Sequence, residues 1–313
     1  MDSSIIITFA IPLFFGLILI EFFYGVITKQ NNYRINDAIT SMSLGLISRF
    51  VPILGLGFQY VVYKAVAEHY NLKLLSGEEI WVWVTAFILY DICYYWMHRI
   101  HHEIKVFWAT HVVHHHGEEF NLATALRQTS TGFLWKWVFF LPLFIIGIPP
   151  QMYVTVAGLN LVYQFWVHTE HIGRLGFLEY IFVTPSNHRV HHAQNEDYLD
   201  ANYGGVFILW DRLFGTFIDE RSDLKPVYGT VKPLKSFNPF WANIEVFYQM
   251  IFDSYHTEKF TDKIRVWFSP PNWRPEDVSM KYPIDKNDLS SFEKYDPNTV
   301  SYTHLRAHET TNY

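Results

Sequence analysis

The first part of the chain alternates between long apolar runs and short polar connectors. Residues 5–27 hold a single charge, Glu21, and at about 1.5 Å per residue a helix of this length can cross a bilayer. No basic residue precedes this run and no small-x-small cleavage site follows it, so we expect it to remain as an anchor. A second, less pure run extends to about residue 63. It is interrupted by Arg49, Pro52 and several glycines, and it predicts a kinked or tilted span.

Two further apolar runs follow. Residues 80–97 are apolar except for Asp91, and they predict a third span that ends at His98. Residues 133–167 are broken near the middle by the turn sequence GIPP, so they predict a hairpin of two short helices. Each arm is marginal in length for a full crossing, and the hairpin is either two spans or a re-entrant pair. In both cases the chain returns to the side it left, which brings His168 to the same face as His98.

The remainder of the chain is more polar. Its aromatic residues are interleaved with charges, and the stretch 238–268 predicts a helix that lies along the membrane surface. The last residues do not continue the composition of those before them, so we expect this tail to be non-native and give His304 and His308 no role. The pattern divides the chain into N-terminal spans at 1–79, a central domain at 80–220 with the membrane hairpin at 133–167, a polar or interfacial region at 221–299, and the tail at 300–313.

Composition agrees with an all-α, polytopic integral membrane protein. The chain is 50% hydrophobic, 19% aromatic and only 17% charged. Its net charge of −6 gives no basic field, so we exclude nucleic acid as a partner. The single cysteine, Cys93, excludes an intrachain disulfide and any cysteine-rich zinc or iron–sulfur site, and we expect it to pack as an apolar residue.

The distribution of basic residues predicts the orientation in the membrane. Because lysine and arginine are enriched on the cytoplasmic side, we expect the histidine-rich side, and with it the active site, to face the cytoplasm. The basic residues on that side are Lys29, Arg34, Arg99, Lys105, Arg127, Arg174 and Arg189.

Histidine is the unusual feature of the composition. The chain has 16 histidines, and 12 of them lie between His98 and His192. Three clusters have ligand spacing, because positions i, i+3 and i+4 of a helix share one face. A single metal rarely accepts more than six ligands, so nine candidates predict two metals, or one metal with outer histidines. The all-imidazole set suits iron, zinc or copper. The candidate ligands are His98, His102, His111, His114, His115, His168, His188, His191 and His192.

The other histidines have a different expected role. His69 and His256 stand alone, and we expect ordinary interfacial or core residues there. His101, His116 and His171 adjoin candidate ligands but point elsewhere on a helix, so we expect them outside the metal's direct ligand set.

The clusters resemble those of the fatty acid hydroxylase superfamily of membrane oxygenases. The pattern H-x-x-x-H, H-x-x-H-H, H-x-x-H-H occurs here in that order. Within the superfamily, the stretches 94–128, 164–176 and 184–217 are similar to those of the alkylglycerol monooxygenases. The resemblance implies a catalytic domain over about residues 80–220 and two iron ions, a di-iron centre, held by the nine candidate histidines.

The resemblance also implies an activity. In this family the carbon next to the ether oxygen of an alkylglycerol is hydroxylated, and the resulting hemiacetal collapses to a fatty aldehyde and a glycerol product. Tetrahydrobiopterin supplies the electrons there. The sequence has no Rossmann or flavin fingerprint, so we expect tetrahydrobiopterin or another external donor, with a separate reductase as one source of electrons. The expected partners are a lipid substrate, molecular oxygen and the bilayer.

Polar residues near the clusters are candidates for supporting roles. Asp91 lies within an apolar span, where an unpaired carboxylate is costly, so we expect it and Glu170 to orient metal-binding imidazoles. Arg127 and Gln128 are candidates to bind the substrate head group or the pterin.

Three alternatives stay open. A hydroxylase or desaturase of sterols, fatty acids or carotenoids would use the same site. A zinc-dependent membrane hydrolase is disfavoured because the chain lacks H-E-x-x-H with its general base. A non-catalytic metal-binding or transporting protein would carry ligands along its spans rather than at their ends.

Overall fold

The computed structural model describes residues 3–53, 58–75, 77 and 79–297, so the C-terminal tail at 300–313 lies outside the described residues. Within the described ranges the chain is helical and forms no strand apart from two isolated bridges, which confirms the all-α class. The α-helices are α1 (Ser3–Thr28), α2 (Ile35–Ser48), α3 (Phe50–Ile53), α4 (Gln59–His69), α5 (Ile80–Glu103), α6 (Lys105–Trp108), α7 (Val112–His115), α8 (Leu141–Ile146), α9 (Pro150–Trp166), α10 (Pro185–His191), α11 (Leu209–Phe214), α12 (Pro239–His256), α13 (Phe260–Phe268) and α14 (Glu276–Lys281).

Two helices in the described ranges, α1 and α5, are long and apolar enough to cross a membrane. The predicted second span is not one helix: α2 ends at Ser48, the short α3 follows, and α4 begins at Gln59. Polar residues explain why α2 differs from a lipid-facing span, because its Asp37, Thr40 and Ser41 are buried against the protein. The number of spans therefore stays a prediction beyond these two helices.

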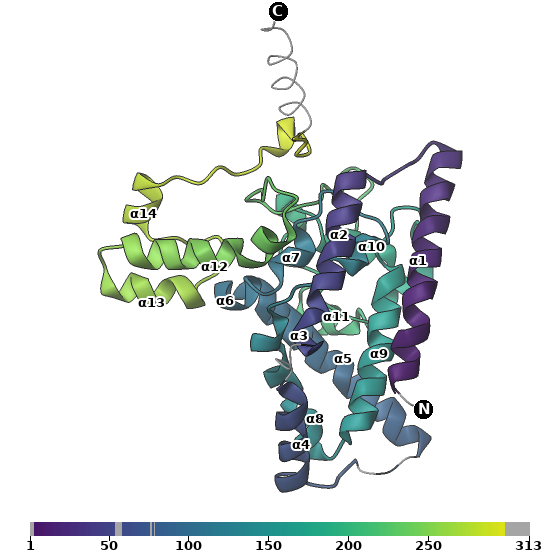
Figure 1. Ribbon diagram of the computed structural model, residues 1–313. Helices are drawn as coiled ribbons and strands as arrows, with labels where there is room; N and C mark the ends of the chain where they lie inside the picture. The colour runs from purple at the N-terminus through teal and green to yellow at the C-terminus, as the bar shows by residue number, and fades with distance from the viewer. Residues whose placement is uncertain (1–2, 54–57, 76, 78, 298–313) are drawn as a thin grey trace, which may run out of the picture.

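The upright helices pack around α9. In Figure 1, α1 and α9 run side by side, and α9 also packs against α5. Phe14 of α1 stacks on Phe165 of α9 with ring centroids 3.9 Å apart. The only charge within α1, Glu21, is buried and accepts hydrogen bonds from the hydroxyls of Tyr33 and Thr169 and from the backbone N–H of Leu122. This carboxylate ties α1 to the segment that follows α9.

The GIPP sequence separates α8 from α9 and reverses the chain. Gly147 has φ of 120°, a left-handed conformation that favours glycine, and an added Cβ would lie 3.0 Å from the backbone nitrogen of Leu75. Pro149 is the N-cap of α9 and Pro150 its first residue, where a missing N–H costs nothing. Because α9 runs back toward the end of α5, His168, two residues beyond α9, lies near His98.

The main apolar core lies between α4, α5, α8 and α9. Tyr63, Tyr90, Phe140 and Phe144 are buried in it, and the partly buried Cys93 packs against them, as expected for an apolar residue. A separate arm, formed by α12 and α13, projects sideways from the bundle in Figure 1.

Candidate metal centre

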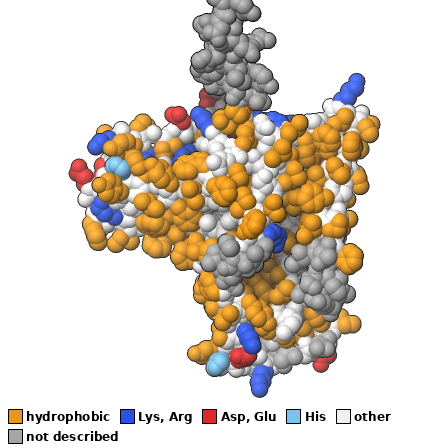
Figure 2. Space-filling view, viewed as in Figure 1, with side chains coloured by type: hydrophobic (Ala, Val, Ile, Leu, Met, Phe, Trp, Pro, Cys, Tyr) orange, Lys and Arg blue, Asp and Glu red, His pale blue; other side chains and the backbone are white. Residues whose placement is uncertain are grey.

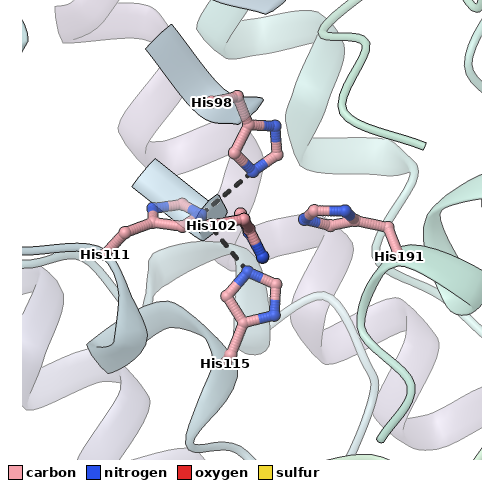
Figure 3. Close-up of side chains that lie close together, drawn as sticks. All are labelled: His98, His102, His111, His115 and His191. Carbon is pink, nitrogen blue, oxygen red and sulfur yellow. Dashed lines mark hydrogen bonds between the residues drawn. The ribbon is translucent and has the colours of Figure 1, made fainter. Parts of the chain in front are cut away.

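The first group of imidazoles comes from three helices. His98 and His102 lie one turn apart on α5, His111 precedes α7, His115 ends α7, and His191 ends α10. One nitrogen from each of these five lies within 4.8 Å of the others, and all five residues are buried. Figure 3 shows the rings directed toward a common centre. Imidazole nitrogens that converge in this way can bind a metal ion.

The second group has four imidazoles. His114 comes from α7, His168 follows α9, His188 lies on α10, and His192 comes directly after α10. Their ligand nitrogens also lie within 4.8 Å of one another. All nine predicted ligands therefore fall into one of two groups.

The two groups are neighbours because α7 and α10 contribute to both. His114 and His115 are consecutive in the chain, as are His191 and His192, and each pair is divided between the groups. The rings of His115 and His192 stack with centroids 4.4 Å apart. Two metals bound here would lie close together, which suits a reaction that needs two redox ions.

The hydrogen bonds of the second group indicate a cation between its rings. Nδ1 of His114 lies 3.1 Å from the carbonyl oxygen of Arg127, and Nδ1 of His168 lies 2.8 Å from that of Gln164. A carbonyl only accepts, so each Nδ1 carries the proton and each neutral ring has a bare lone pair at Nε2. The two Nε2 atoms are nevertheless 3.2 Å apart. Two lone pairs repel at this distance, whereas a metal ion between them would be bound by both.

The first group shows the same arrangement behind its rings. Nδ1 of His98 donates to the carbonyl of Tyr203 at 2.8 Å, and Nδ1 of His191 donates to the carbonyl of Ala201 at 2.9 Å. Both rings therefore direct an unprotonated Nε2 into the group. Nε2 of His102 and of His191 is buried without a hydrogen-bond partner among the described residues, as is Nε2 of His192 in the second group. Buried polar atoms normally have a partner, and a metal would supply it.

Burial holds the histidines in the form that binds metal. Desolvation, followed by repulsion from neighbouring imidazoles, lowers the pKa of His111, His115 and His192 well below the usual value. Desolvation lowers the pKa of His191 to about 4. These rings are neutral at pH 7, and neutral imidazole is the ligand.

Acidification should destabilise the metal-free protein. Between the ordinary pKa of 6.5 and the lowered value of His191, the unfolded chain binds a proton that the folded chain does not. Stability is therefore full above about pH 6.5 and falls as the pH drops, by about 1 kcal/mol per shifted histidine at pH 5.5. Thermal unfolding of the metal-free protein should show a lower midpoint at pH 5.5 than at pH 7.5. An unchanged midpoint would contradict the neutral, buried state of these rings.

Asp91 is buried inside α5, and in the described part of the chain none of the donors that bind its carboxylate is an imidazole. Its carboxylate instead accepts four hydrogen bonds from segments far along the chain, which explains how a charge is tolerated in an apolar helix. The donors are the backbone N–H of Val206 at 2.9 Å, the backbone N–H of Phe207 at 3.0 Å, Nε1 of Trp210 at 2.9 Å and Nδ2 of Asn160 at 2.8 Å.

The loop held by Asp91 is the loop that orients His98. Tyr203, which accepts the Nδ1 proton of His98, also donates its backbone N–H to Asp211 at 2.7 Å. Gly205 lies against Asp91, and an added Cβ there would come within 2.8 Å of the carboxylate oxygen. Asp91 and Asp211 thus hold the loop from both sides and position His98 indirectly.

Glu170 lies further from the imidazoles. Its carboxylate accepts a hydrogen bond from the hydroxyl of Tyr228 at 3.2 Å. Tyr228 stacks on Phe120 with centroids 4.8 Å apart, and Phe120 in turn lies against His192 with centroids 5.2 Å apart. Tyr228 and Phe120 therefore form one line of contacts from Glu170 to the second group.

Arg127 and Gln128 are consecutive but have different environments. The Arg127 guanidinium is buried, pairs with Asp37 at 3.2 Å and donates from Nε to the carbonyl of Val113 at 2.9 Å. It braces α2 against α7, and its own carbonyl orients His114. Gln128 lines the cavity described next, and its side-chain amide donates to the carbonyl of Ala125 at 3.0 Å.

The remaining histidines lie outside both groups. His101 is buried, and its Nδ1 lies 2.6 Å from the carbonyl of Met97. His69 is exposed at the end of α4, and the ring of His256 packs on Phe252 with centroids 4.0 Å apart. His116 and His171 likewise belong to neither group.

A cavity of about 440 Å³ reaches the histidines from the apolar part of the bundle. Its wall includes His111 of the first group and His114 and His168 of the second. Elsewhere the wall is largely aliphatic and aromatic, with contributions from α1, α2, α5 and α9. The hydrophobic pattern did not reveal which residues line this cavity, because they are of the same types as those that face lipid or the core.

Comparison with known proteins agrees with this geometry. Residues 83–216 match the family model described as fatty acid hydroxylase. The chain is 38% identical over 290 residues to alkylglycerol monooxygenase of Xenopus tropicalis, which covers 92% of this chain and 64% of the relative. It is 40% identical over 267 residues to alkylglycerol monooxygenase of Homo sapiens, which covers 85% of this chain and 59% of the relative.

The name of a more distant relative refers to a different lipid. Ornithine lipid hydroxylase of Rhizobium tropici is 28% identical over 142 residues, covering 43% of this chain and 41% of the relative. No solved structure matches the chain significantly. The chain spans less than two thirds of the length of the two alkylglycerol monooxygenases. The match at 83–216 contains all nine histidines of the two groups, and this part of the chain belongs to the fatty acid hydroxylase family.

Proposed function

We propose that the protein is an oxygen-dependent, di-iron lipid monooxygenase that oxidises alkylglycerols at the carbon next to the ether oxygen. The observation that carries this proposal is the apolar cavity whose wall includes imidazoles of both histidine groups. A long alkyl chain would fit such a wall, and its ether end would lie beside the metals. The high identity to curated alkylglycerol monooxygenases supports this substrate over a sterol or a free fatty acid.

The cavity gives the substrate a route from the bilayer. Ile11 and Phe15 of α1 and Leu46 of α2 line the cavity, and each of these side chains is exposed. This exposure would allow a lipid to enter from the side of the bundle, between α1 and α2. Apolar walls also exclude water from the reacting carbon, which protects a strong oxidant from side reactions.

The nine histidines would hold the two iron ions, which would supply the activation of molecular oxygen. Backbone carbonyls fix the rings of His98, His114, His168 and His191 through Nδ1. In the balanced reaction, one oxygen atom enters the C–H bond and the other becomes water, with two electrons and two protons consumed. The hemiacetal product breaks its carbon–oxygen bond to the glycerol and leaves a fatty aldehyde.

The two electrons must come from outside the chain. Tetrahydrobiopterin is the proposed donor, with another external donor or a separate reductase as the alternative. The distribution of basic residues supports a metal centre at the cytoplasmic ends of the spans, where a soluble donor would reach it.

A larger side chain in the cavity should block the substrate and spare the metals. Ala157 of α9 lines the cavity, whereas Leu159 on the same helix is exposed and does not. We expect Ala157→Phe to lower the turnover of a long-chain alkylglycerol at least about tenfold, because a misplaced substrate loses its alignment with the metals. Metal content should not change. Leu159→Phe is the matched control and should keep full turnover; equal activity of the two variants would show that the cavity is not the substrate site.

The proposal as a whole is tested by anaerobic reconstitution with ferrous iron, followed by addition of oxygen and lipid. The protein should convert an alkylglycerol to a fatty aldehyde, and the rate should depend on tetrahydrobiopterin. Parallel assays use a sterol, a free fatty acid and an ornithine lipid. Turnover of one of these without turnover of alkylglycerol would contradict the substrate while leaving the family unchanged.

A further inference from the structure

Helix α12 has its polar and apolar faces reversed relative to a helix on the surface of a water-soluble protein. Every exposed residue of α12 is aromatic or aliphatic. These residues recur at helical spacing on one face, which carries no charge. They are Phe240, Ile244, Tyr248, Ile251 and Tyr255, and each is at least half exposed.

The polar residues of α12 point into the protein, where they have partners. Asp253 is fully buried and pairs with Arg274 through both carboxylate oxygens at 2.8 and 2.9 Å. Glu245 is buried against Lys232, and Asn243 accepts the backbone N–H of Ser130 at 2.8 Å. The inner face is therefore fixed by ion pairs and hydrogen bonds. A rotation of α12 that buried its apolar face would break these ion pairs and hydrogen bonds. The inner contacts therefore keep the apolar face exposed.

Helix α13 extends the apolar surface. Phe260, Ile264 and Phe268 are spaced by four residues along it and are more than half exposed. Lys259 precedes α13, and the exposed Arg265 stacks over Trp273. Together with the α12 face, these three residues form what we call the arm surface: Phe240, Ile244, Tyr248, Ile251, Tyr255, Phe260, Ile264 and Phe268.

The arm is oriented as a helix pair lying in the plane of a membrane would be. In Figure 1, α12 and α13 run across the direction of α1, one of the two candidate spans. Figure 2 shows hydrophobic side chains over both the arm and the bundle, with charged side chains along the upper edge, at the tip of the arm and at the lower end of the bundle. An amphipathic helix at an interface has this crosswise direction, this one-sided apolar face and basic residues near its edge.

We propose that the arm surface docks on the lipid bilayer, with its Phe and Ile side chains in the boundary between head groups and acyl chains. Lipid is the occupant that fits best, because phenylalanine and tyrosine are mixed with isoleucine as in interfacial belts, and because the arm joins a bundle that already exposes the apolar length of α1. Lys259 and Arg265 would face anionic head groups.

The docked arm would determine how deep the metal centre lies relative to the bilayer. Helix α12 packs against α7, which carries His114 and His115, and against α2, which lines the cavity. Contact of the arm with the bilayer would therefore hold the mouth of the cavity level with the lipid from which the substrate comes. This inference does not depend on which lipid is oxidised.

Fluorescent labels on single cysteines test the docking directly. In a Cys93→Ser background, the arm variants are Ile251→Cys and Ile264→Cys, and the control is Glu276→Cys, an exposed residue of α14 outside the arm surface. Each is labelled with an environment-sensitive dye and reconstituted in vesicles of phosphatidylcholine with phosphatidylglycerol. We expect quenching by spin-labelled acyl chains at the two arm positions and quenching by aqueous iodide at the control.

Two outcomes would overturn the proposal. Iodide quenching at both arm positions would show that the surface faces water. Resistance to both quenchers would show that protein covers it, either a second copy or another segment. A third label at Tyr255, the most exposed residue of α12 at 79%, repeats the test if one of the first two variants does not fold. Metal content and thermal unfolding of each variant establish folding independently of activity.

Discussion

Replacing His191 with alanine should remove a metal from the first group and leave the second group occupied. His191 supplies one of five converging nitrogens there, and its ring is held by the carbonyl of Ala201. Even partners that only orient a ligand change metal affinity or activity about 10- to 100-fold when removed, so loss of a ligand should lower turnover more than about 100-fold. Iron content should fall from two per chain toward one, as measured by metal analysis of the purified protein.

The corresponding variant of the second group replaces His168. His168→Ala should also lower iron content toward one per chain, and a protein with both replacements should fall toward none. His69→Ala is the control, because this histidine is exposed at the end of α4 and belongs to neither group. A His191→Ala protein with two irons and full oxygen consumption would show that the first group is not a metal site.

Replacing Asp91 with alanine should destabilise the protein by about 4 kcal/mol or more. The substitution leaves two buried and two partly buried donors without an acceptor, at about 1–3 kcal/mol for each buried donor. It also frees the loop that presents the Tyr203 carbonyl to His98, so any protein that folds should bind metal in the first group about 10- to 100-fold more weakly. Chemical unfolding and metal titration measure the two effects separately.

Glu170→Gln provides the contrast for Asp91. Glu170 accepts one hydrogen bond, from the hydroxyl of Tyr228, and this tyrosine contacts the second group through the ring of Phe120. A glutamine can still accept that hydrogen bond, so stability and metal affinity should change little. If Glu170→Gln weakened metal binding as much as Asp91→Ala, Glu170 would support the metal ligands as strongly as Asp91 does, which would contradict this expectation.

The ligand spacing in the sequence was sufficient to predict which histidines come together. The clusters lie at the end of α5, at α7 and at α10, and the GIPP turn predicts that His168 returns to the same end as His98. The division into two groups was not predictable in the same way. Consecutive residues such as His191 and His192 enter different groups because of how α10 sits between α5 and α7, which spacing alone does not describe.

The supporting residues show the limits of local patterns more clearly. Asp91 was expected to orient a metal-binding imidazole, and it does so only indirectly, because its hydrogen-bond partners lie 69 to 119 residues away in the sequence and hold the loop that orients His98. Arg127 was a candidate for a substrate or pterin contact, but its guanidinium is used to pair with Asp37 of α2. Neither partner could be found from sequence, because both depend on the packing of distant helices. The break between α2 and α4 was obscured for a related reason: the run looks like one apolar segment although α2 faces protein with polar residues.

The central claim is that iron held at the end of the apolar cavity inserts oxygen next to the ether bond of a lipid. Oxygen-isotope labelling tests it most directly. The iron-reconstituted protein is given ¹⁸O₂, tetrahydrobiopterin and an alkylglycerol, and the aldehyde is reduced at once to the alcohol to prevent exchange with water. The account predicts ¹⁸O in the fatty alcohol and none in the glycerol, with no product from His168→Ala. A fatty product without ¹⁸O, or one formed in the absence of oxygen, would contradict it.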